Sequence, residues 1–238
     1  MSFSNFSEPI LDRMTKPLLQ LCGRWGLEPA ELTHRVALWV AWTGLTWLAF
    51  VSSLLFVEVG ERSDLSLVEG LVGGGLIGLA QWLVLRTYLQ RAQRWIVATA
   101  MGWGLLTLLH IGALGWMAPG TPNLFFRGVL GVLYGAYVGL GLGLGQWLAI
   151  RREVHRAWRW VPISSGIWAA AIALGWLVGG ELRAASNLFI SEVVGLMVAW
   201  GAIAALSGLG IVGLLHQTAR TNQPKSILQS SQPSIGGR

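Results

Sequence analysis

The chain has 238 residues, of which 53% are hydrophobic and 12% are charged, and its mean hydropathy is +0.57. Soluble domains carry about 25% charged residues, so the composition excludes an ordinary soluble protein and indicates an integral membrane protein. The single cysteine, Cys22, excludes an intramolecular disulfide and a paired-cysteine metal site.

Residues 1–35 form a segment ahead of the first long apolar block. Ser7, followed by an acidic residue and a proline, is typical of a helix start, and apolar residues recur at helical spacing as far as Leu21. We predict a short amphipathic helix that lies on the cytoplasmic membrane surface and is interrupted near Pro17. A helix that docks a partner protein is the alternative.

Six apolar blocks follow, and each is long enough for a helix that crosses the hydrocarbon core, which takes about 20 residues. They cover residues 36–57, 65–85, 95–117, 128–150, 160–180 and 192–215. The sequence therefore predicts an all-α, polytopic membrane protein whose six-helix domain comprises residues 36–216. Residues 217–238 are rich in Ser, Gln and Pro and lack periodicity, so we expect a disordered tail.

Basic residues are distributed unevenly between the two sides of this arrangement. Of the 17 Lys and Arg residues, 14 lie before the first block, after the second, after the fourth or in the tail. Arg62, Arg127 and Arg183 lie in the three remaining loops. Cytoplasmic loops carry the excess of Lys and Arg, so we predict that both termini are cytoplasmic.

The chain repeats itself at an offset of 65 residues. Residues 70–103 and 135–168 align without a gap and share 13 identities in 34 positions. The shared pattern is Gly-x3-Gly-x3-Gly-Leu-x-Gln-Trp-Leu-x2-Arg-x4-Arg-Ala-x-Arg-Trp-x7-Trp. Such a match indicates a duplicated helical hairpin, which we place at residues 70–118 and 135–180.

A third, split copy is predicted from the two ends of the domain. Arg35, Trp39 and Trp47 repeat the Arg-x3-Trp-x7-Trp spacing of both copies, and residues 190–216 resemble the glycine-rich outgoing helix without its Gln-Trp pair. Residues 190–216 and 36–57 would then complete a third hairpin. Because all copies enter the membrane in the same direction, we predict parallel repeats with approximate three-fold pseudosymmetry about the membrane normal.

Glycines at every fourth position leave a flat stripe on the outgoing helix of each copy, where a neighbouring backbone can approach closely. The stripes comprise Gly70, Gly74, Gly78, Gly135, Gly139 and Gly143. We predict helix packing at these stripes. The alternative is a space for a flat ligand such as a pigment or a sterol.

Gln81 and Gln146 lie about one turn inside the cytoplasmic boundary, just past the last glycine of each stripe. A buried amide in hydrocarbon needs a partner, so these side chains either clamp neighbouring helices or line a central ligand site. Trp82 and Trp147 each precede an arginine by one turn, which favours cation–π stacking and a place in the interfacial aromatic belt.

Arginines recur at the cytoplasmic helix ends of all three copies. A ring of six guanidinium groups would comprise Arg35, Arg86, Arg91, Arg151, Arg156 and Arg220. The positive-inside bias alone accounts for such a ring. The alternative is a site whose bidentate contacts hold an anionic lipid headgroup or an acidic surface of a partner.

Patterns that would carry catalysis or transport are missing from the sequence. No charged residue falls in the middle of a block, which disfavours an ion-coupled transporter. His110 is the one histidine within a block; we expect a hydrogen bond to a neighbouring helix, and coordination of a haem or chlorophyll is the alternative. Hydrolase, metalloprotease and phosphate-loop motifs are absent, so we expect no enzyme, no metal and no resident cofactor.

The Gly-rich Gln-Trp-Leu-x2-Arg repeat resembles one found in uncharacterised polytopic membrane proteins of cyanobacteria. The resemblance covers the second to fifth blocks, with a weaker echo in the first and the last. It implies a thylakoid or plasma membrane in a phototroph and adds weight to pigment-related roles, but it carries no established activity.

Two functions are consistent with these patterns. The leading one is a non-catalytic scaffold or assembly factor that packs against a larger membrane complex and engages lipid or a partner protein through its arginines. The alternative is a lipid, pigment or small-molecule binder or carrier that uses the central axis of the bundle. Nucleic acid is not an expected partner, because the basic residues lie in short loops against the membrane. A polar central cavity would favour the binder, and a dry, glycine-packed axis with an apolar outer groove would favour the scaffold.

Overall fold

The computed structural model describes residues 29–57, 65–110 and 118–222, and in these ranges the regular structure is helical. The elements are α2 (Pro29–Ser53), α3 (Leu67–Leu85), α4 (Gln93–Leu108), α5 (Leu124–Ile150), the short 3-10 helix η3 (Ala157–Arg159), α6 (Trp160–Ser186) and α7 (Ile190–Asn222). The expected surface helix before Pro17 lies outside the described residues, as do residues 223–238 of the expected tail.

Five of these helices, α2, α3, α5, α6 and α7, are long and apolar enough to cross a membrane, as a multi-pass membrane protein requires. The described part of α4 has 16 residues and is therefore about 24 Å long, which is short of the hydrocarbon thickness of about 30 Å. The rest of the predicted span, residues 111–117, is outside the described residues.

Two helices extend beyond the apolar blocks that predict them. Helix α2 begins at Pro29, ahead of the block at residue 36, so Arg35 lies within the helix. Helix α7 continues to Asn222, so residues 217–222 of the expected disordered tail are helical. In both cases the helix runs on into polar residues that hydropathy assigns to water.

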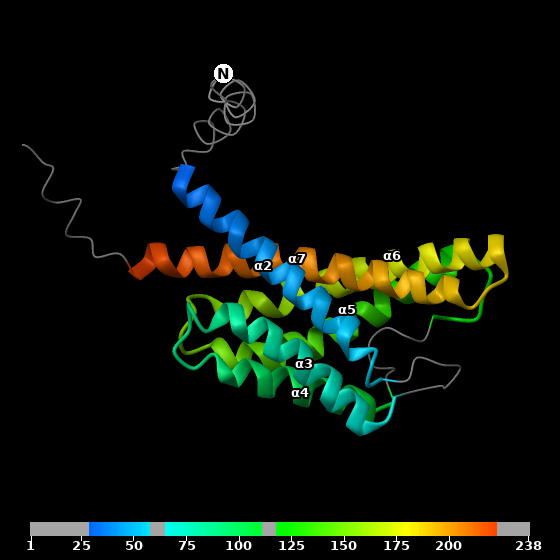
Figure 1. Cartoon of the computed structure of the whole chain (residues 1–238), viewed down its shortest axis with the longest axis horizontal. Coiled ribbons are helices and arrows are strands. Elements are labelled where there is room, and N and C mark those ends of the chain that lie inside the picture. The colour runs from blue at the N-terminus through cyan, green and yellow to red at the C-terminus, as the bar shows by residue number, and fades with distance from the viewer. Residues whose placement is uncertain (1–28, 58–64, 111–117, 223–238) are drawn as a thin grey trace, which may run out of the picture.

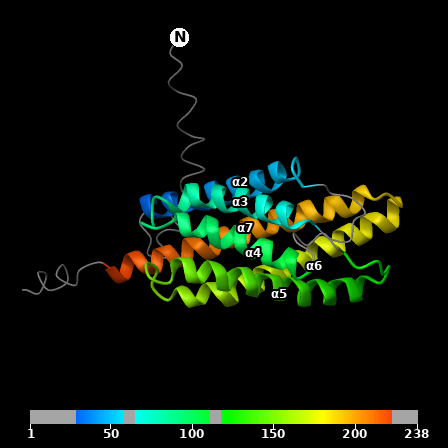
Figure 2. The same cartoon turned by 90° about the horizontal axis from the view of Figure 1, so that it is seen from below.

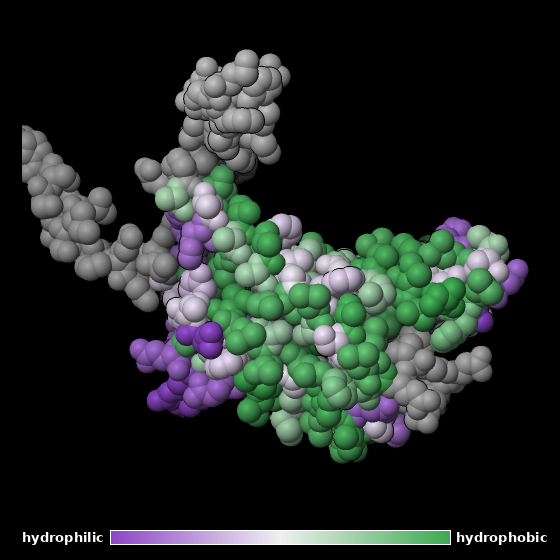
Figure 3. All heavy atoms as spheres, in the orientation of Figure 1, coloured by the Kyte–Doolittle hydropathy of each residue, from purple (hydrophilic) through white to green (hydrophobic). Residues whose placement is uncertain are grey.

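The six long helices form a closed ring. Each packs against its neighbours in the chain, and α7 packs against α2 to close the circle (Figures 1 and 2). The start of α2, the α3–α4 and α5–α6 loops and the end of α7 lie at one end, which we call the basic end. The space-filling view shows a broad apolar middle, with hydrophilic residues at the basic end and also at the opposite end (Figure 3).

Polar contacts tie the loops of the basic end together. The Tyr88 hydroxyl lies 2.9 Å from Nε2 of His34, which joins the α3–α4 loop to α2. The backbone N–H of Gln90 donates to the Glu153 carboxylate at 2.7 Å, which joins the two loops. Burial raises the pKa of the Tyr88 phenol and outweighs a smaller lowering by Thr87, so the phenol is protonated at neutral pH and can donate to His34.

Local signals set the helix ends opposite the basic end. Ser66 and Glu69 form a capping box at the start of α3. Asn123 caps α5 by accepting from the backbone N–H groups of Phe125 and Phe126. Asn187, with φ of 57°, ends α6 in the left-handed conformation and starts the turn into α7.

The glycine stripes face the partner helix of their own hairpin rather than an open space. A Cβ atom on Gly74 would lie 2.5 Å from Cδ1 of Trp103, and one on Gly78 would lie 3.0 Å from Cα of Ile96 in α4. Gly70 faces Thr107 of α4 in the same way. The second stripe repeats this against α6: Gly135 faces the Trp168 backbone, Gly139 the Ser164 carbonyl and Gly143 Val161. Each stripe thus lets two backbones approach closely.

Two glycines of α5 offer a matched test of this packing. A Cβ on Gly139 would lie 2.6 Å from the Ser164 carbonyl oxygen, whereas one on Gly141 would have nothing within 4 Å. We expect Gly139→Ala to lower the free energy of unfolding by about 1–3 kcal/mol, the usual cost of overpacking. Gly141→Ala should be neutral or raise it by up to about 1 kcal/mol, because alanine is the better helix former. Unfolding of both variants in detergent, followed by circular dichroism, measures this; equal losses would contradict it.

Candidate functional site

Six tryptophans fill the axis of the ring in two layers. Trp95 lies with its ring centroid 6.1 Å from that of Trp42 and 5.7 Å from that of Trp160. In the second layer the centroids of Trp103, Trp168 and Trp200 are 5.4–5.8 Å apart in all three pairs. All six side chains are buried. Aromatic rings therefore occupy the axis.

The indole N–H groups of the first layer each have an acceptor on a neighbouring helix. Trp95 Nε1 donates to Gln81 Oε1 at 2.8 Å, and Trp160 Nε1 donates to Gln146 Oε1 at 2.8 Å. Gln146 Nε2 also donates to the Thr99 hydroxyl at 3.2 Å, so this amide joins three helices, α4, α5 and α6. Both glutamines thus clamp helices together, as the first of the two interpretations predicts.

The third indole corrects the register expected for the split copy. Trp42, not Trp39, lies beside Trp95, and its Nε1 donates to the Ser207 hydroxyl at 2.9 Å. Trp39 instead donates to the Ala205 carbonyl at 2.8 Å from a partly buried position. The residue two turns beyond Trp42 is Phe50, which stacks on Trp200 at 4.4 Å. Phe50 thus stands where the expected spacing has a tryptophan.

Between the two layers lies a small polar cavity. Gln81, Gln146, Thr99 and Ser164 contribute to its lining, together with tryptophan rings, and its volume is about 30 Å³. A buried water molecule needs at least about 10–15 Å³ of such volume, so the cavity has room for one or two waters. A haem, a chlorophyll or a sterol does not fit there.

Two of the predicted arginines stack on the tryptophan one turn before them. The guanidinium carbon of Arg86 lies 5.3 Å from the Trp82 ring centroid, and that of Arg151 lies 5.7 Å from the Trp147 centroid. Such cation–π contacts contribute about 0.5–2 kcal/mol each. The expected stacking is confirmed for both pairs.

The other predicted arginines have different surroundings. Arg35 donates to Glu31 at 2.6 Å and contacts His216, whose Nδ1 lies 3.1 Å from the same carboxylate oxygen. Arg91 and Arg156 are exposed, and the side chain of Arg220 is outside the described part of the chain. Arg35, Arg86 and Arg151 therefore contact the chain's own side chains, although Arg86 and Arg151 are exposed like Arg91 and Arg156.

His110 does not lie inside a span as expected. It follows the end of α4 at Leu108, adopts the left-handed conformation with φ of 52° and is exposed. Among residues 29–57, 65–110 and 118–222, no cluster of three His, Cys, Asp or Glu side chains could hold a metal ion.

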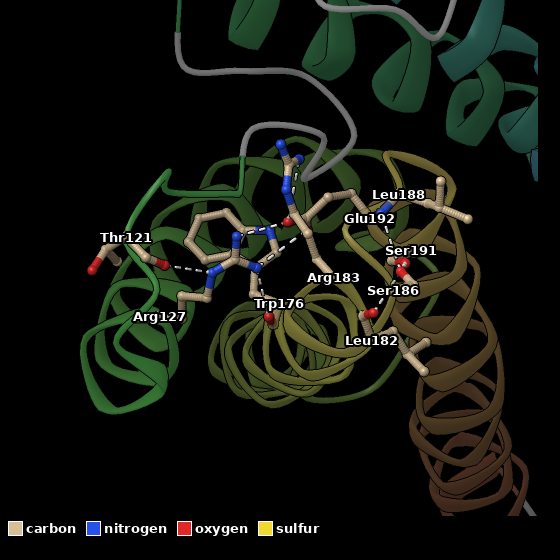
Figure 4. Close-up of polar contacts among 9 residues, drawn as sticks. All are labelled: Thr121, Arg127, Trp176, Leu182, Arg183, Ser186, Leu188, Ser191 and Glu192. Atoms are coloured by element: carbon tan, nitrogen blue, oxygen red, sulfur yellow. Dashed lines mark hydrogen bonds and ion pairs between the residues drawn. The ribbon is translucent and has the colours of Figure 1, made fainter.

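A buried ion pair, which the sequence did not reveal, lies at the end opposite the basic end (Figure 4). Arg127 Nη2 donates to Glu192 Oε1 at 2.7 Å, and Nη1 donates to Oε2 at 3.2 Å, so α5 and α7 are joined by two parallel bonds. Arg127 also donates to the carbonyl oxygens of Thr121 and Trp176. Its side chain is 6% exposed and that of Glu192 is 10% exposed. The expectation that Arg127 lies in a loop is wrong.

Two glycines of α6 make room for this pair. A Cβ on Gly180 would lie 2.9 Å from Cδ of Arg127, and one on Gly179 would lie 2.9 Å from Oε2 of Glu192. The signals in the sequence that could have pointed to the contact are the Gly-Gly pair at 179–180 and the two charges at the edges of other apolar blocks, Arg127 and Glu192. Hydropathy assigns both charges to water, because it scores each residue without its partner.

Comparison of the chain with family models, with curated proteins and with solved structures found no match.

The ion pair predicts a strong asymmetry between single and double variants. Glu192→Ala leaves the Arg127 guanidinium buried without its counterion, so we expect the free energy of unfolding to fall by about 3–5 kcal/mol. The double variant Arg127→Met, Glu192→Leu removes both charges and should cost much less. Detergent unfolding of the three proteins measures the difference. If the double variant were as unstable as the single one, the loss of stability would come from packing in the glycine-lined space and not from an unpaired charge.

Proposed function

We propose that this protein is a non-catalytic, six-span integral membrane protein that acts as a scaffold or assembly factor for a larger membrane complex, in a plasma or thylakoid membrane. The observation that carries the proposal is the filled axis. The six tryptophan rings leave about 30 Å³ between them, so this part of the axis, within the described residues, has no room for a substrate, while the outer face offers extensive apolar surface.

The polar groups inside the bundle support a structural role. Gln81 and Gln146 are used to hold indoles, and Arg127 and Glu192 are used to hold each other. A transporter or an enzyme of this size would keep an ionisable group free to meet its substrate. A binder or carrier that uses the central axis gains no support from a cavity of one or two waters.

Three hairpins, α3–α4, α5–α6 and α7–α2, would account for the matched contacts. In each hairpin a tryptophan N–H donates to the facing helix. Gly78, Gly143 and Gly208, spaced at 65 residues, each lie against the returning helix, where Gly208 meets Trp39 and Trp42. These parallels favour the predicted three-fold pseudosymmetry, in which α4 is the sixth span.

The proposed orientation puts the basic end and both termini in the cytoplasm. We expect a Cys22→Ser, Gly120→Cys variant to react in intact cells or spheroplasts with a membrane-impermeant maleimide, because Gly120 lies in the α4–α5 loop at the opposite end, where a Cβ meets nothing within 4 Å. A Cys22→Ser, Lys225→Cys variant should react only after lysis. The reverse pattern would contradict the orientation, and labelling of both from one side would contradict three spans, α5, α6 and α7, between the two positions.

The scaffold role predicts a defined complex that is lost when the outer surface changes. We expect gentle extraction from native membranes, followed by native mass spectrometry and an absorption spectrum, to yield one stoichiometric protein assembly without pigment. Val40, Leu133 and Leu174 are exposed on α2, α5 and α6, so tryptophan at one of them should abolish the assembly without lowering the unfolding temperature. A bare monomer would overturn the scaffold, and a stoichiometric pigment lost in Gln81→Leu would establish the binder instead.

A further inference from the structure

An apolar groove of about 770 Å³ runs along the outside of the bundle between α4 and α5. Figure 2 shows these two helices side by side. The volume falls in the range of about 300–1,000 Å³ that is typical of small-molecule sites. Ten of the twelve lining residues are apolar or glycine, and the two polar ones, Gln93 and Arg94, are both at the start of α4, at the basic end.

Small residues make the floor of this groove. Gly102 of α4 lies against Leu142, and Gly145 of α5 lies against the Ala98 carbonyl, so the two helices touch along a line of residues with little side chain. Gly141 faces open space in the groove. Larger side chains such as Met101 and Leu148 form the walls and are exposed. The result is a channel that is open to the surroundings of the bundle and deep enough for an extended apolar chain.

Apolar lining alone does not select an occupant in a membrane, because lipid tails are as apolar as leucine. The charge at the basic end of the groove does select an occupant. Arg94 is exposed and, within the described part of the chain, its side chain makes no hydrogen bond or ion pair. Helix α4 begins there without a side-chain cap and without an acidic residue in its first turn, which also favours an anion. Glu153, the one acid of the two adjoining loops, is bound to backbone N–H groups of Gln90 and Arg91.

The contact between α6 and α7 at the basic end can be compared with the contact between α4 and α5. Arg159 stands 65 residues after Arg94 and donates to Gln217 of α7 at 3.2 Å. The residue 65 positions before Gln217 is Arg152. By this 65-residue correspondence, Arg152 takes the place at the α4–α5 contact that Gln217 has at the α6–α7 contact. Arg152 is exposed in the α5–α6 loop at the basic end, and Arg94 lines the groove at the same end. Arginines in this setting favour an anionic partner.

We infer that the α4–α5 groove binds one anionic phospholipid, with its phosphate at Arg94 and Arg152 and an acyl chain along Gly141 and Gly145. Basic pockets between membrane helices at the cytoplasmic side are the usual setting for such headgroups. The site lies outside the arginine ring predicted from the sequence, of which Arg94 is not a member. The bound lipid would form part of the outer face of the bundle. The proposed scaffold role depends on that face.

The test uses the purified full-length protein in detergent, titrated with phosphatidylglycerol or phosphatidylcholine and observed by native mass spectrometry. We expect one phosphatidylglycerol adduct, bound at least fivefold more tightly than phosphatidylcholine. Arg94→Gln should remove about fivefold of that preference, the fold-change of about 1 kcal/mol per surface arginine. Gly141→Leu should lose the adducts of both lipids, because the new side chain fills the groove without meeting a neighbour within 4 Å of its Cβ.

Matched controls separate the groove from general effects. Gly166→Leu on α6 also places its Cβ in open space, and Arg86→Gln removes one charge from the basic end of α3. Both should bind phosphatidylglycerol as the unchanged protein does, and Arg94→Gln, Gly141→Leu and Gly166→Leu should keep its unfolding temperature. Equal binding of the two lipids, retention of the adduct in Gly141→Leu, or an equal loss in Gly166→Leu would overturn the inference. A partner helix protected in the groove instead of lipid would also overturn it.

Discussion

The rest of the bundle depends on three buried indole N–H groups and their acceptors. Hydrocarbon offers no hydrogen-bond partner, so each N–H must find one on a neighbouring helix. Gln81, Gln146 and Ser207 supply the acceptors. Each bond fixes how the returning helix is rotated about its own axis, and the residue two turns further along then faces the centre as well. One requirement in the first layer of rings therefore orients the second layer too.

The sequence predicted the class of fold because class depends on composition and periodicity, which are local. The all-α, multi-pass character is confirmed by five helices that could cross a membrane. The rotation of α2 about its own axis was harder to predict, since Trp39 and Trp42 are three residues apart and lie on nearly the same face of this helix. The choice between them rests on Ser207 and Gly208 of α7, which are more than 160 residues away in the chain.

The Arg127–Glu192 pair was missed for a related reason. A charge at the edge of an apolar block is assigned to water, because the free energy of transfer is counted for one residue at a time. The pair instead satisfies its donors and acceptors internally, including two backbone carbonyls. Gly179 and Gly180 provide the space. Only the packing of α5, α6 and α7 together brings these four residues to one place.

Neighbouring helices of the ring do not all pack against each other in the same way. Within the hairpins, glycine stripes draw two backbones together, and between α6 and α7 Gly175 and Gly195 do the same. Between α4 and α5, Gly145 lies against the Ala98 carbonyl, whereas Gly141 faces outward over the groove. A small residue in a membrane helix is stabilising only when something packs against it. Because no described residue packs against Gly141, the proposed lipid is placed on the α4–α5 face.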